Sequence, residues 1–250
     1  NMSWKKYPMD YKIIIQARMG SSRLPGKVLI ELAPGRTALE CLIDRLTICI
    51  PKENIIIATT TAENDKAILD LSARLNIKAF AGSEQNVLQR YYGAAQECNA
   101  KNIVRITSDC PLMDSALLVD MLKDFASNEC DYLSNTIERT YPRGLDIEIL
   151  TFKALERAYL EAKSQPELEH VTPYIHQHPK LFKLKHYQQQ QDLSFHRWTL
   201  DTEEDLELIT KIYQELYPRD KNFTTSDILK LFSQNADLMN INAHIEQKKI

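Results

Sequence analysis

The chain has 250 residues, of which 44% are hydrophobic and 26% are charged, the balance of an ordinary globular protein with a sizeable core. Six glycines and ten prolines exclude collagen-like chains and disordered chains rich in these residues. The formal net charge of -3 and the lack of a basic stripe argue against a nucleic-acid partner.

The first half of the chain alternates short buried strands with amphipathic helices. Strands are predicted at 12–16, 55–60, 77–80 and 103–107, and helices at 39–48, 64–75, 87–98 and 115–125. Helices of ~10–13 residues between β-branched runs indicate βαβ units with right-handed crossovers. The pattern therefore predicts an α/β fold around a parallel sheet.

Beyond residue 131 the regular alternation of strands and helices ends. Strands are predicted at 132–134, 145–149, 182–187 and 197–200, and helices at 152–162, 168–176, 203–216 and 225–232. The sequence contains no internal repeat and no linker rich in proline or serine. We therefore expect one domain at 11–217 with an inserted arm of about 137–195, followed by a C-terminal helix and polar tail at 218–250.

The loop that follows the first predicted strand, 17–27, contains three cations and two of the six glycines. Glycines let the backbone approach a ligand, and Arg and Lys neutralise phosphate oxygens. Ligands of open α/β sheets bind beyond the carboxyl ends of the strands, so the loop predicts a polyphosphate site; the alternative is a solvated turn. A P-loop is excluded, because five residues separate Gly20 from Gly26 and Val28 replaces the Mg²⁺-binding hydroxyl.

Two aspartates follow predicted strands. Asp109 comes after the strand at 103–107, and Mg²⁺ binds through few protein carboxylates, with water and substrate phosphates supplying the rest. Its alternative role is to cap the next helix, although Asp114 is the better candidate for that cap. Asp201 is the second candidate ligand, and the two glutamates after it make helix capping a strong alternative.

The other candidate polar residues give weaker signals. Asp146 and Glu148 alternate along one predicted strand and therefore share a face, which meets either substrate or solvent. His170 follows Glu169 on a predicted helix, where a structural or surface role is favoured.

The cysteines, the histidines and the hydropathy pattern argue against a zinc site, a disulfide framework and a membrane span. The five cysteines and six histidines show no zinc-ligand spacing, and an odd number of cysteines argues against a disulfide framework. No apolar run approaches the ~20 residues that cross a bilayer, and the N-terminal residues lack the apolar region of a signal peptide. We therefore expect a cytoplasmic protein with no membrane partner.

Eight blocks of the sequence form an ordered pattern. They read IIQARMGSSRLPGKVL (14–29), ATTT (58–61), VLQRYY (87–92), RITSDCPL (105–112), YLSNT (132–136), YPRGLDIE (141–148), EHVTPYI (169–175) and RWTLDTEEDL (197–206). Together they resemble the cytidylyltransferase family, and within it the branch similar to spore coat polysaccharide biosynthesis protein F. The resemblance extends over about 11–217, and it is the eight ordered blocks together that make it specific.

The resemblance implies a Rossmann-like nucleotidyltransferase fold of the glycosyltransferase-A type, with three layers, a mostly parallel sheet and an arm that commonly serves dimerisation. It implies a cytidylyltransferase that uses CTP and Mg²⁺. Such an enzyme transfers a cytidylyl group to a nonulosonic- or Kdo-like sugar acid and releases pyrophosphate. The product, a CMP-sugar, would serve surface polysaccharide or glycan biosynthesis, and the protein would be a homodimer.

The resemblance also assigns roles to residues. It implies that Arg18, Lys27 and Asp109 are catalytic and that Asp109 and Asp201 bind the metal. The nucleotide-binding residues it implies are Ala17, Arg18, Met19, Gly20, Ser21, Arg23, Lys27, Thr60, Arg90 and Ser108. The acceptor-binding residues it implies are Arg143, Asp146, Glu148, Glu169 and His170.

The loop departs from the sialic-acid and Kdo cytidylyltransferases at both ends. Those enzymes begin it with Pro-Ala-Arg and usually end it with Pro-x-Lys-Asn, whereas this chain has Gln16-Ala17-Arg18 and Gly26-Lys27-Val28. In addition, Asn86 and Gln89 stand where relatives of the closer branch often carry acids. The prediction of a nucleotide-binding site is unaffected by these differences, but the identity of the sugar acid does not follow from either group of enzymes.

Three alternatives stay open. The first is a nucleotidyltransferase acting on a sugar phosphate, polyol phosphate or phosphonate, for which Arg139, Arg143 and Lys153 offer extra cations. The second is a glycosyltransferase, which Ser108-Asp109-Cys110 disfavours because such enzymes usually carry Asp-x-Asp. The third is a nucleotide-binding protein without catalytic activity.

Overall fold

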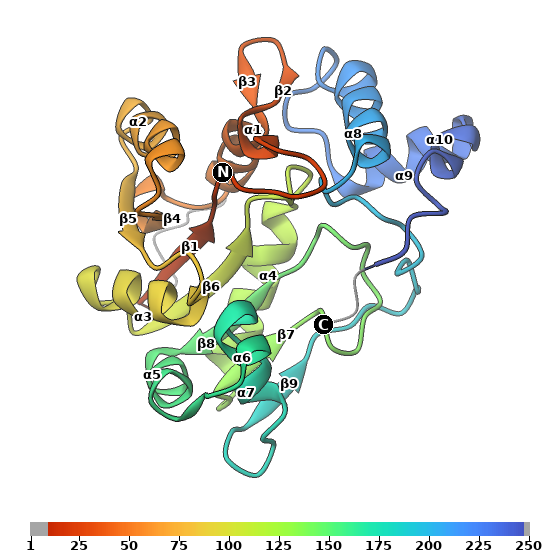
Figure 1. The fold of residues 1–250 in the computed structure, drawn as a ribbon. Helices are drawn as coiled ribbons and strands as arrows, with labels where there is room; N and C mark the ends of the chain where they lie inside the picture. Colours follow the sequence, from red (N-terminus) through yellow and green to blue (C-terminus); the bar gives the residue numbers. More distant parts are fainter. Residues whose placement is uncertain (1–9, 248–250) are drawn as a thin grey trace.

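The structure, a computed structural model, describes residues 10–247 (Figure 1). Its centre is a seven-stranded sheet in the order β5-β4-β1-β6-β8-β7-β9. The strands are β1 (Tyr11–Gln16), β4 (Ile55–Thr60), β5 (Lys78–Gly82), β6 (Asn102–Thr107), β7 (Tyr132–Ser134), β8 (Glu148–Thr151) and β9 (Leu184–His186). Only β8 runs antiparallel to its neighbours in this sheet, so the predicted mostly parallel α/β fold is confirmed.

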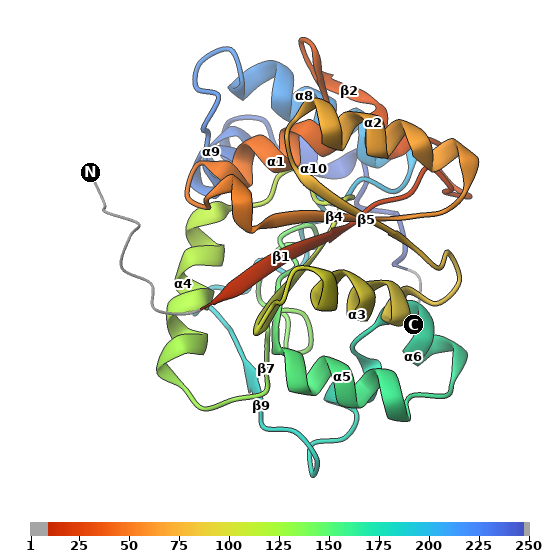
Figure 2. The same cartoon turned by 90° about the vertical axis from the view of Figure 1, so that its left-hand side faces the viewer.

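Helices cover both faces of the sheet. They are α1 (Ala38–Thr47), α2 (Lys66–Arg74), α3 (Val87–Glu97), α4 (Ser115–Ser127), α5 (Phe152–Glu161), α6 (Gln165–His170), α7 (Pro173–His176), α8 (Glu203–Leu216), α9 (Thr225–Gln234) and α10 (Asp237–Asn240). In Figure 2, α1 and α2 lie above the strands and α3 and α5 lie below them, which makes three layers. Within residues 10–247, no helix is long and apolar enough to cross a bilayer.

Strand β1 shows why apolar and polar residues do not alternate along the parallel strands. Ile13 and Ile15 pack in one core cluster with residues of α1, α2 and α4, and Ile14 packs in another with residues of α3 and α5. All three side chains are fully buried. Because both faces are covered, each isoleucine contributes about 1.5–3 kcal/mol of hydrophobic stabilisation.

Several predicted elements differ from those observed. The hairpin of β2 (Glu31–Ala33) and β3 (Arg36–Thr37) was not predicted, because its strands are too short to show a period of two. The predicted helix at 168–176 is two helices, α6 and α7. Val171 between them has a φ of 71°, outside the right-handed helical region, so α6 ends there.

The predicted strand at 197–200 is wrong. The segment forms a single β-bridge, between Arg143 and Arg197, and lies outside the sheet. Its apolar residues Trp198 and Leu200 are buried instead in a core cluster with α8 and α9, which produces the same alternation as a strand. Gly144 permits this packing, because its φ is 103° and a Cβ there would lie 2.5 Å from the Trp198 carbonyl.

Much of the segment predicted as an inserted arm, 137–195, is built into the main body. It supplies β8, which lies in the sheet between β6 and β7, and it supplies α5 and α7, which pack on one face. The predicted strand at 145–149 begins later, at Glu148. The use of this segment in dimerisation stays a prediction.

The C-terminal segment continues the core beyond α8. The helix α9 is observed close to its predicted bounds, and residues of α9 and α10 pack in the cluster beneath α8. The predicted polar tail therefore contains one more short helix and the buried Asn242. The last three residues of the predicted tail, 248–250, lie outside the described residues.

Candidate active site

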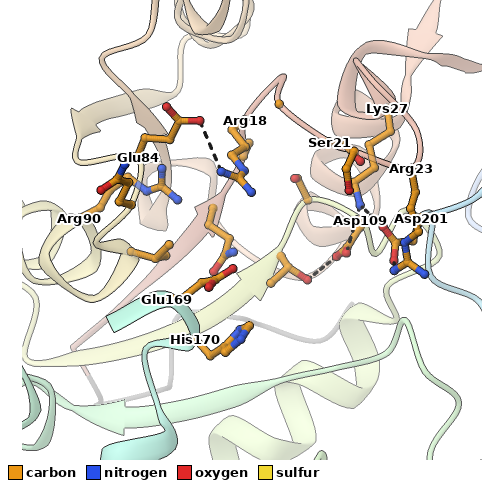
Figure 3. A pocket seen from close by; sticks show the side chains of 18 of the residues that line it. Arg18, Ser21, Arg23, Lys27, Glu84, Arg90, Asp109, Glu169, His170 and Asp201 are labelled. Atoms are coloured by element: carbon orange, nitrogen blue, oxygen red, sulfur yellow. Dashed lines mark hydrogen bonds and ion pairs between the residues drawn. The ribbon is translucent and has the colours of Figure 1, made fainter. Parts of the chain in front are cut away.

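A cleft of about 540 Å³ opens at the carboxyl ends of the parallel strands, where the strand order reverses between β1 and β6 (Figure 3). The predicted site residues that line it are Ala17, Arg18, Gly20, Ser21, Arg23, Lys27, Arg90, Ser108, Asp109, Glu169, His170 and Asp201. Residues that are far apart in the sequence therefore meet at one edge of the sheet, as the strand pattern predicted for the loop 17–27 and Asp109.

The loop after β1 is closed at its base. The N–H of Gly26 donates to the Met19 carbonyl at 3.1 Å, with Gly26 at a φ of 69°. Asp65 braces the loop from below, because its carboxylate accepts bonds from the Met19 N–H at 2.6 Å and from the Thr60 hydroxyl. Met19 and Thr60, which were predicted to bind nucleotide, do not line the cleft and instead shape the loop.

The middle of this loop offers free backbone donors. Within residues 10–247, the N–H groups of Gly20, Ser21, Ser22 and Arg23 have no hydrogen-bond acceptor. All four residues line the cleft at consecutive positions. A run of unpaired N–H groups beside cations is a concave anion site of the kind that binds phosphates.

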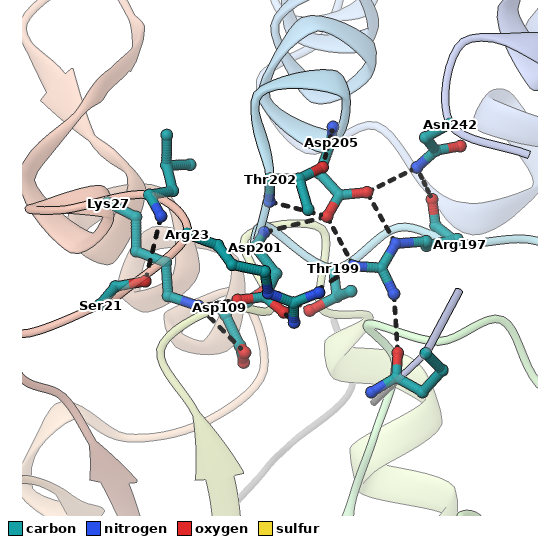
Figure 4. A network of polar contacts seen from close by, with 12 residues as sticks. Ser21, Arg23, Lys27, Asp109, Arg197, Thr199, Asp201, Thr202, Asp205 and Asn242 are labelled. Atoms are coloured by element: carbon teal, nitrogen blue, oxygen red, sulfur yellow. Dashed lines mark hydrogen bonds and ion pairs between the residues drawn. The ribbon is translucent and has the colours of Figure 1, made fainter. Parts of the chain in front are cut away.

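Two carboxylates meet at the end of the loop (Figure 4). The Lys27 ammonium lies 3.5 Å from Asp109 Oδ2 and 3.2 Å from Asp201 Oδ1. Arg23 forms an ion pair with Asp201, and the Thr107 hydroxyl donates to Asp109 Oδ1 at 2.5 Å. The two aspartates therefore point at one common position, which the Lys27 ammonium shares.

The segment before α8 brings Asp201 to this position. The Asp109 carbonyl accepts bonds from the Leu200 N–H at 2.8 Å and from the Thr199 hydroxyl at 3.2 Å, which ties the two aspartate loops together. Thr202 caps α8 in a capping box with Asp205. Asp201 is therefore not the cap, and its carboxylate instead faces Lys27 and Arg23 in the cleft.

Asp109 is likewise not a helix cap. Asp114 caps α4 by accepting bonds from two backbone N–H groups, as the sequence predicted. Burial by itself would raise the pKa of the Asp109 carboxyl, but the Lys27 ammonium and the Thr107 hydroxyl outweigh it and hold the pKa below its usual value. Asp109 is therefore ionised at neutral pH.

The residues present fit a hard divalent cation. Asp109 and Asp201 supply carboxylate oxygens that converge on one cationic group. Among residues 10–247 no group of three or more His, Cys, Asp and Glu is placed to hold a metal. A cation held by only these two carboxylates needs water and substrate oxygens to complete its coordination, which is the usual arrangement of Mg²⁺ and differs from a structural zinc site.

The other end of the cleft holds two arginines from different elements. Arg18 forms an ion pair with Glu84 at 3.5 Å. Arg90 on α3 is only 1% exposed, and its Nε and Nη1 atoms have no hydrogen-bond partner in the described part of the chain. Burial lowers the pKa of Arg90, because a desolvated cation is disfavoured. A buried donor without a partner favours a polar ligand beside it.

Some residues that line the cleft were not predicted. They are Gln16, Ser22, Glu84, Gln85, Val87, Arg105, Thr107, Gln165 and Gln247. Glu84 and Gln85 follow the carboxyl end of β5. The principle that ligands bind beyond the carboxyl ends of the strands, which identified Asp109, would therefore also have identified them. Arg105 and Thr107 belong to β6 itself, while Gln165 and Gln247 had no signal in the sequence.

Glu148, which was predicted to bind the acceptor, does not line the cleft. Its carboxylate is buried and accepts bonds from the Tyr132 hydroxyl at 2.5 Å and the Thr172 hydroxyl at 2.6 Å, and it pairs with Arg105 at 2.5 Å. Burial alone would raise the Glu148 pKa, but Arg105 and the two hydroxyls lower it. Glu148 therefore holds Arg105, which does line the cleft.

Arg143 and Asp146 line a smaller cavity of about 90 Å³ next to the cleft. The Asp146 carboxylate is bound by both terminal nitrogens of Arg139, at 2.6 and 2.9 Å. Asp146 and Glu148 thus do not share a face as predicted, because the strand starts only at Glu148. Of the predicted acceptor residues, Glu169 and His170 face the main cleft from α6, and Arg143 and Asp146 face the smaller cavity.

Comparisons with known proteins show the family to which the chain belongs. A family model described as Cytidylyltransferase matches residues 12–239. The uncharacterized protein MJ1063 of Methanocaldococcus jannaschii is 38% identical over 94% of this chain and 95% of that protein. The spore coat polysaccharide biosynthesis protein SpsF of Bacillus subtilis is 32% identical over 91% of this chain and 96% of its own length. A solved cytidylyltransferase structure from Leptospira borgpetersenii has a TM-score of 0.88 at 33% identity and covers 96% of this chain and 100% of that chain.

Proposed function

Since the chain belongs to the cytidylyltransferase family and is a nucleotidyltransferase, we propose that it activates a sugar acid as its CMP-sugar. The reaction uses CTP and Mg²⁺ and releases pyrophosphate, and its product serves surface polysaccharide or glycan biosynthesis. The observation that carries the proposal is the convergence of Lys27, Asp109 and Asp201 beside a loop with free N–H donors. The relative from Bacillus subtilis, named for spore coat polysaccharide biosynthesis, supports the pathway class.

In this proposal the loop binds the triphosphate. The N–H groups of Gly20, Ser21 and Ser22 donate to phosphate oxygens, and Arg18 and Arg23 neutralise the β- and γ-phosphates. Without nucleotide these cations pair with Glu84 and Asp201. Binding of CTP therefore exchanges existing ion pairs for phosphate contacts.

The chemical step is an in-line displacement at the α-phosphorus. The acceptor hydroxyl oxygen forms a new bond to the α-phosphorus and loses its proton to solvent water. The bond between the α-phosphorus and the oxygen that it shares with the β-phosphorus breaks, and pyrophosphate leaves. Asp109 and Asp201 would hold Mg²⁺, which when bound neutralises charge on the phosphate oxygens. Lys27 lies at the same position and stabilises the charge that develops on the departing pyrophosphate. Catalysis then depends on positioning and electrostatics.

The acceptor half of the cleft suits a sugar acid. Burial lowers the pKa of His170, and Arg105 lowers it further although Glu169 opposes them, so a neutral imidazole with one donor and one acceptor faces the cleft. Among the described residues, Arg143 is the one cation that lines the smaller cavity. One guanidinium matches the single charge of a carboxylate.

The same geometry disfavours the sugar-phosphate alternative. Of the three cations that it requires, Arg139 is already neutralised by Asp146, and Lys153 is an exposed residue of α5 that lines neither cavity. Of these three cations, only Arg143 would remain to pair with an acceptor phosphate, which carries nearly two negative charges. The observed charges therefore favour a carboxylate on the acceptor.

A screen tests the proposed function directly. The purified chain is incubated with CTP, Mg²⁺ and a panel of sugar acids, sugar phosphates and polyol phosphates, and pyrophosphate release is measured. We expect release with a sugar acid and with CTP in preference to the other nucleoside triphosphates. Release with a phosphate acceptor would establish the alternative, and binding of CTP without release for any acceptor would identify a nucleotide-binding protein.

Replacing Arg90 tests the nucleotide half of the cleft. Arg90→Met removes a buried cation whose Nε and Nη1 have no partner, so the nucleotide-free protein should gain about 1 kcal/mol of unfolding free energy. The same variant should bind CTP roughly 10-fold more weakly, because one charge-assisted contact is lost. Urea unfolding and equilibrium CTP binding measure the two effects.

Arg45→Met is the matched control. Arg45 is also buried on a helix, but its Nε donates to the Met113 carbonyl at 2.7 Å and its guanidinium lies 4.4 Å from the centre of the Phe223 ring. It is remote from the cleft lining. This control should lose stability and keep its CTP affinity. A loss of stability in Arg90→Met with unchanged CTP binding would show that Arg90 has a purely structural role.

A further inference from the structure

The C-terminal segment 241–247 returns to the cleft after α10. Asn242 is buried, and its amide donates to the Arg197 carbonyl at 2.8 Å and to Asp205 Oδ1 at 2.9 Å. Asp205 also accepts bonds from the backbone N–H groups of Asp201 and Thr202 at 3.1 and 3.0 Å. The segment is thereby fastened to the same network that positions the Asp201 carboxylate (Figure 4).

The segment ends against the two cavities. Gln247 Oε1 accepts a bond from Arg197 Nη1 at 2.7 Å, which fixes the direction of its carboxamide. Arg197 is itself held by two bonds to Asp205, at 2.8 and 2.7 Å. Three residues, Thr107, Asp109 and Gln247, line both the main cleft and the smaller cavity. A ligand that contacts Asp109 and enters both cavities therefore meets Gln247.

We propose that the segment 241–247 is part of the acceptor site and that the Gln247 carboxamide binds the acceptor through Nε2. Oε1 is engaged by Arg197, and within the described residues Nε2 has no acceptor, so the ligand group it fits is a hydroxyl or carboxylate oxygen. The inference rests on the proposed function, because it assigns the acceptor side of the same reaction.

The position of Gln247 separates it from the nucleotide. The free N–H donors and the Arg18–Glu84 pair, which the proposed function assigns to the phosphates, line the main cleft alone, whereas Gln247 also lines the smaller cavity. Its neighbours in the smaller cavity include Arg143 and Asp146, which the proposed function assigns to the acceptor. A change at Gln247 should therefore alter acceptor binding and leave CTP binding intact.

The test compares Gln247→Ala and Gln247→Glu with wild type, using the panel acceptor that gives the fastest pyrophosphate release. Loss of one neutral hydrogen bond should raise the KM for this acceptor about 5-fold in Gln247→Ala. Gln247→Glu should raise it further, because a carboxylate repels an acidic acceptor. The KM for CTP should stay unchanged in both variants, and both should remain folded without urea, although Gln247→Ala removes the bond to Arg197. Gln234→Ala, at the exposed end of α9, is the matched control and should change neither KM.

The outcomes distinguish this inference from the proposed function. An unchanged acceptor KM, or a raised KM for CTP instead, overturns the role of Gln247 while the proposed function stands. If no panel compound releases pyrophosphate, the proposed function fails. Calorimetric titration of 3-deoxy-manno-octulosonate and of inorganic phosphate then tests Gln247 alone. Weaker binding of either probe to Gln247→Ala supports the inference, and equal binding, or no binding to wild type, overturns it.

Discussion

Asp109→Asn should lower the rate of pyrophosphate release from CTP by at least ~100-fold, the scale of losing a key transition-state contact. The change removes one negative charge and keeps the size of the side chain. The Thr107 hydroxyl at 2.5 Å can still donate to the amide oxygen, so the local structure should persist. Lys27 then pairs with Asp201 alone, and the pair of anionic oxygens that fits Mg²⁺ is lost. Initial rates at saturating CTP and acceptor measure the effect.

The control for Asp109→Asn is Asp70→Asn, because Asp70 is an exposed aspartate of α2 and lines neither cavity. It should keep the wild-type rate. Asp70→Asn should unfold at the wild-type urea concentration, whereas Asp109→Asn should lose about 1 kcal/mol of unfolding free energy, because it gives up the Lys27 contact while Lys27 keeps Asp201. A rate for Asp109→Asn within about 3-fold of wild type would remove Asp109 from the catalytic residues. A large loss of stability in that variant would assign the effect to folding instead.

The half of the site that is formed by strand ends was predictable from the sequence. The loop at 17–27 and Asp109 follow β1 and β6, and the carboxyl ends of adjacent parallel strands meet at one edge of the sheet. The type of residue then indicated the chemistry, since cations with glycines suit phosphates and an aspartate suits Mg²⁺. The positions of the loop and of Asp109 directly after these strands were sufficient to locate this half of the site, because the sheet brings the ends of its parallel strands together.

The other half depends on tertiary packing that no local pattern reports. Asp201 reaches Asp109 because Trp198 is buried beneath α8 and the backbone of Leu200 bonds to the Asp109 carbonyl. Burial of alternate residues gave this segment the periodicity of a strand, although it lies outside the sheet. Gln247 comes to the cleft through the Arg197–Asp205 network, across 50 residues of sequence. Contacts of this kind have no signature in the composition or the spacing of the residues.

The pairing of charges in the cleft also went beyond the sequence. The sequence predicted that the three cations of the loop bind phosphate. In the structure each of them pairs with a carboxylate from another element, as seen for Arg18, Arg23 and Lys27. These pairs neutralise the three cations of the loop within the protein itself. Under the proposed function Lys27 therefore has two roles, one in the free protein and one in the reaction.

Lys27→Met separates these two roles. Removal of the ammonium should lower pyrophosphate release by at least ~100-fold, because no other group takes its place beside Asp109 and the departing phosphates. In the free protein the variant leaves Asp109 without its cation, while Asp201 keeps Arg23. Without Mg²⁺ the unfolding free energy at pH 7 should therefore fall by about 1–2 kcal/mol, the range for one charge-assisted contact in a partly exposed site.

Adding Mg²⁺ then gives opposite results for the two roles of Lys27. The cation should stabilise Lys27→Met against urea more than it stabilises wild type, since the ammonium no longer competes for the two carboxylates. The rate of pyrophosphate release should stay low, because Mg²⁺ does not replace a donor to the phosphates. Lys66→Met, an exposed lysine at the start of α2, should match wild type in both measurements. If Mg²⁺ stabilised Lys27→Met and wild type equally, the two aspartates would not be its ligands; near-wild-type turnover in Lys27→Met would remove Lys27 from the catalytic residues.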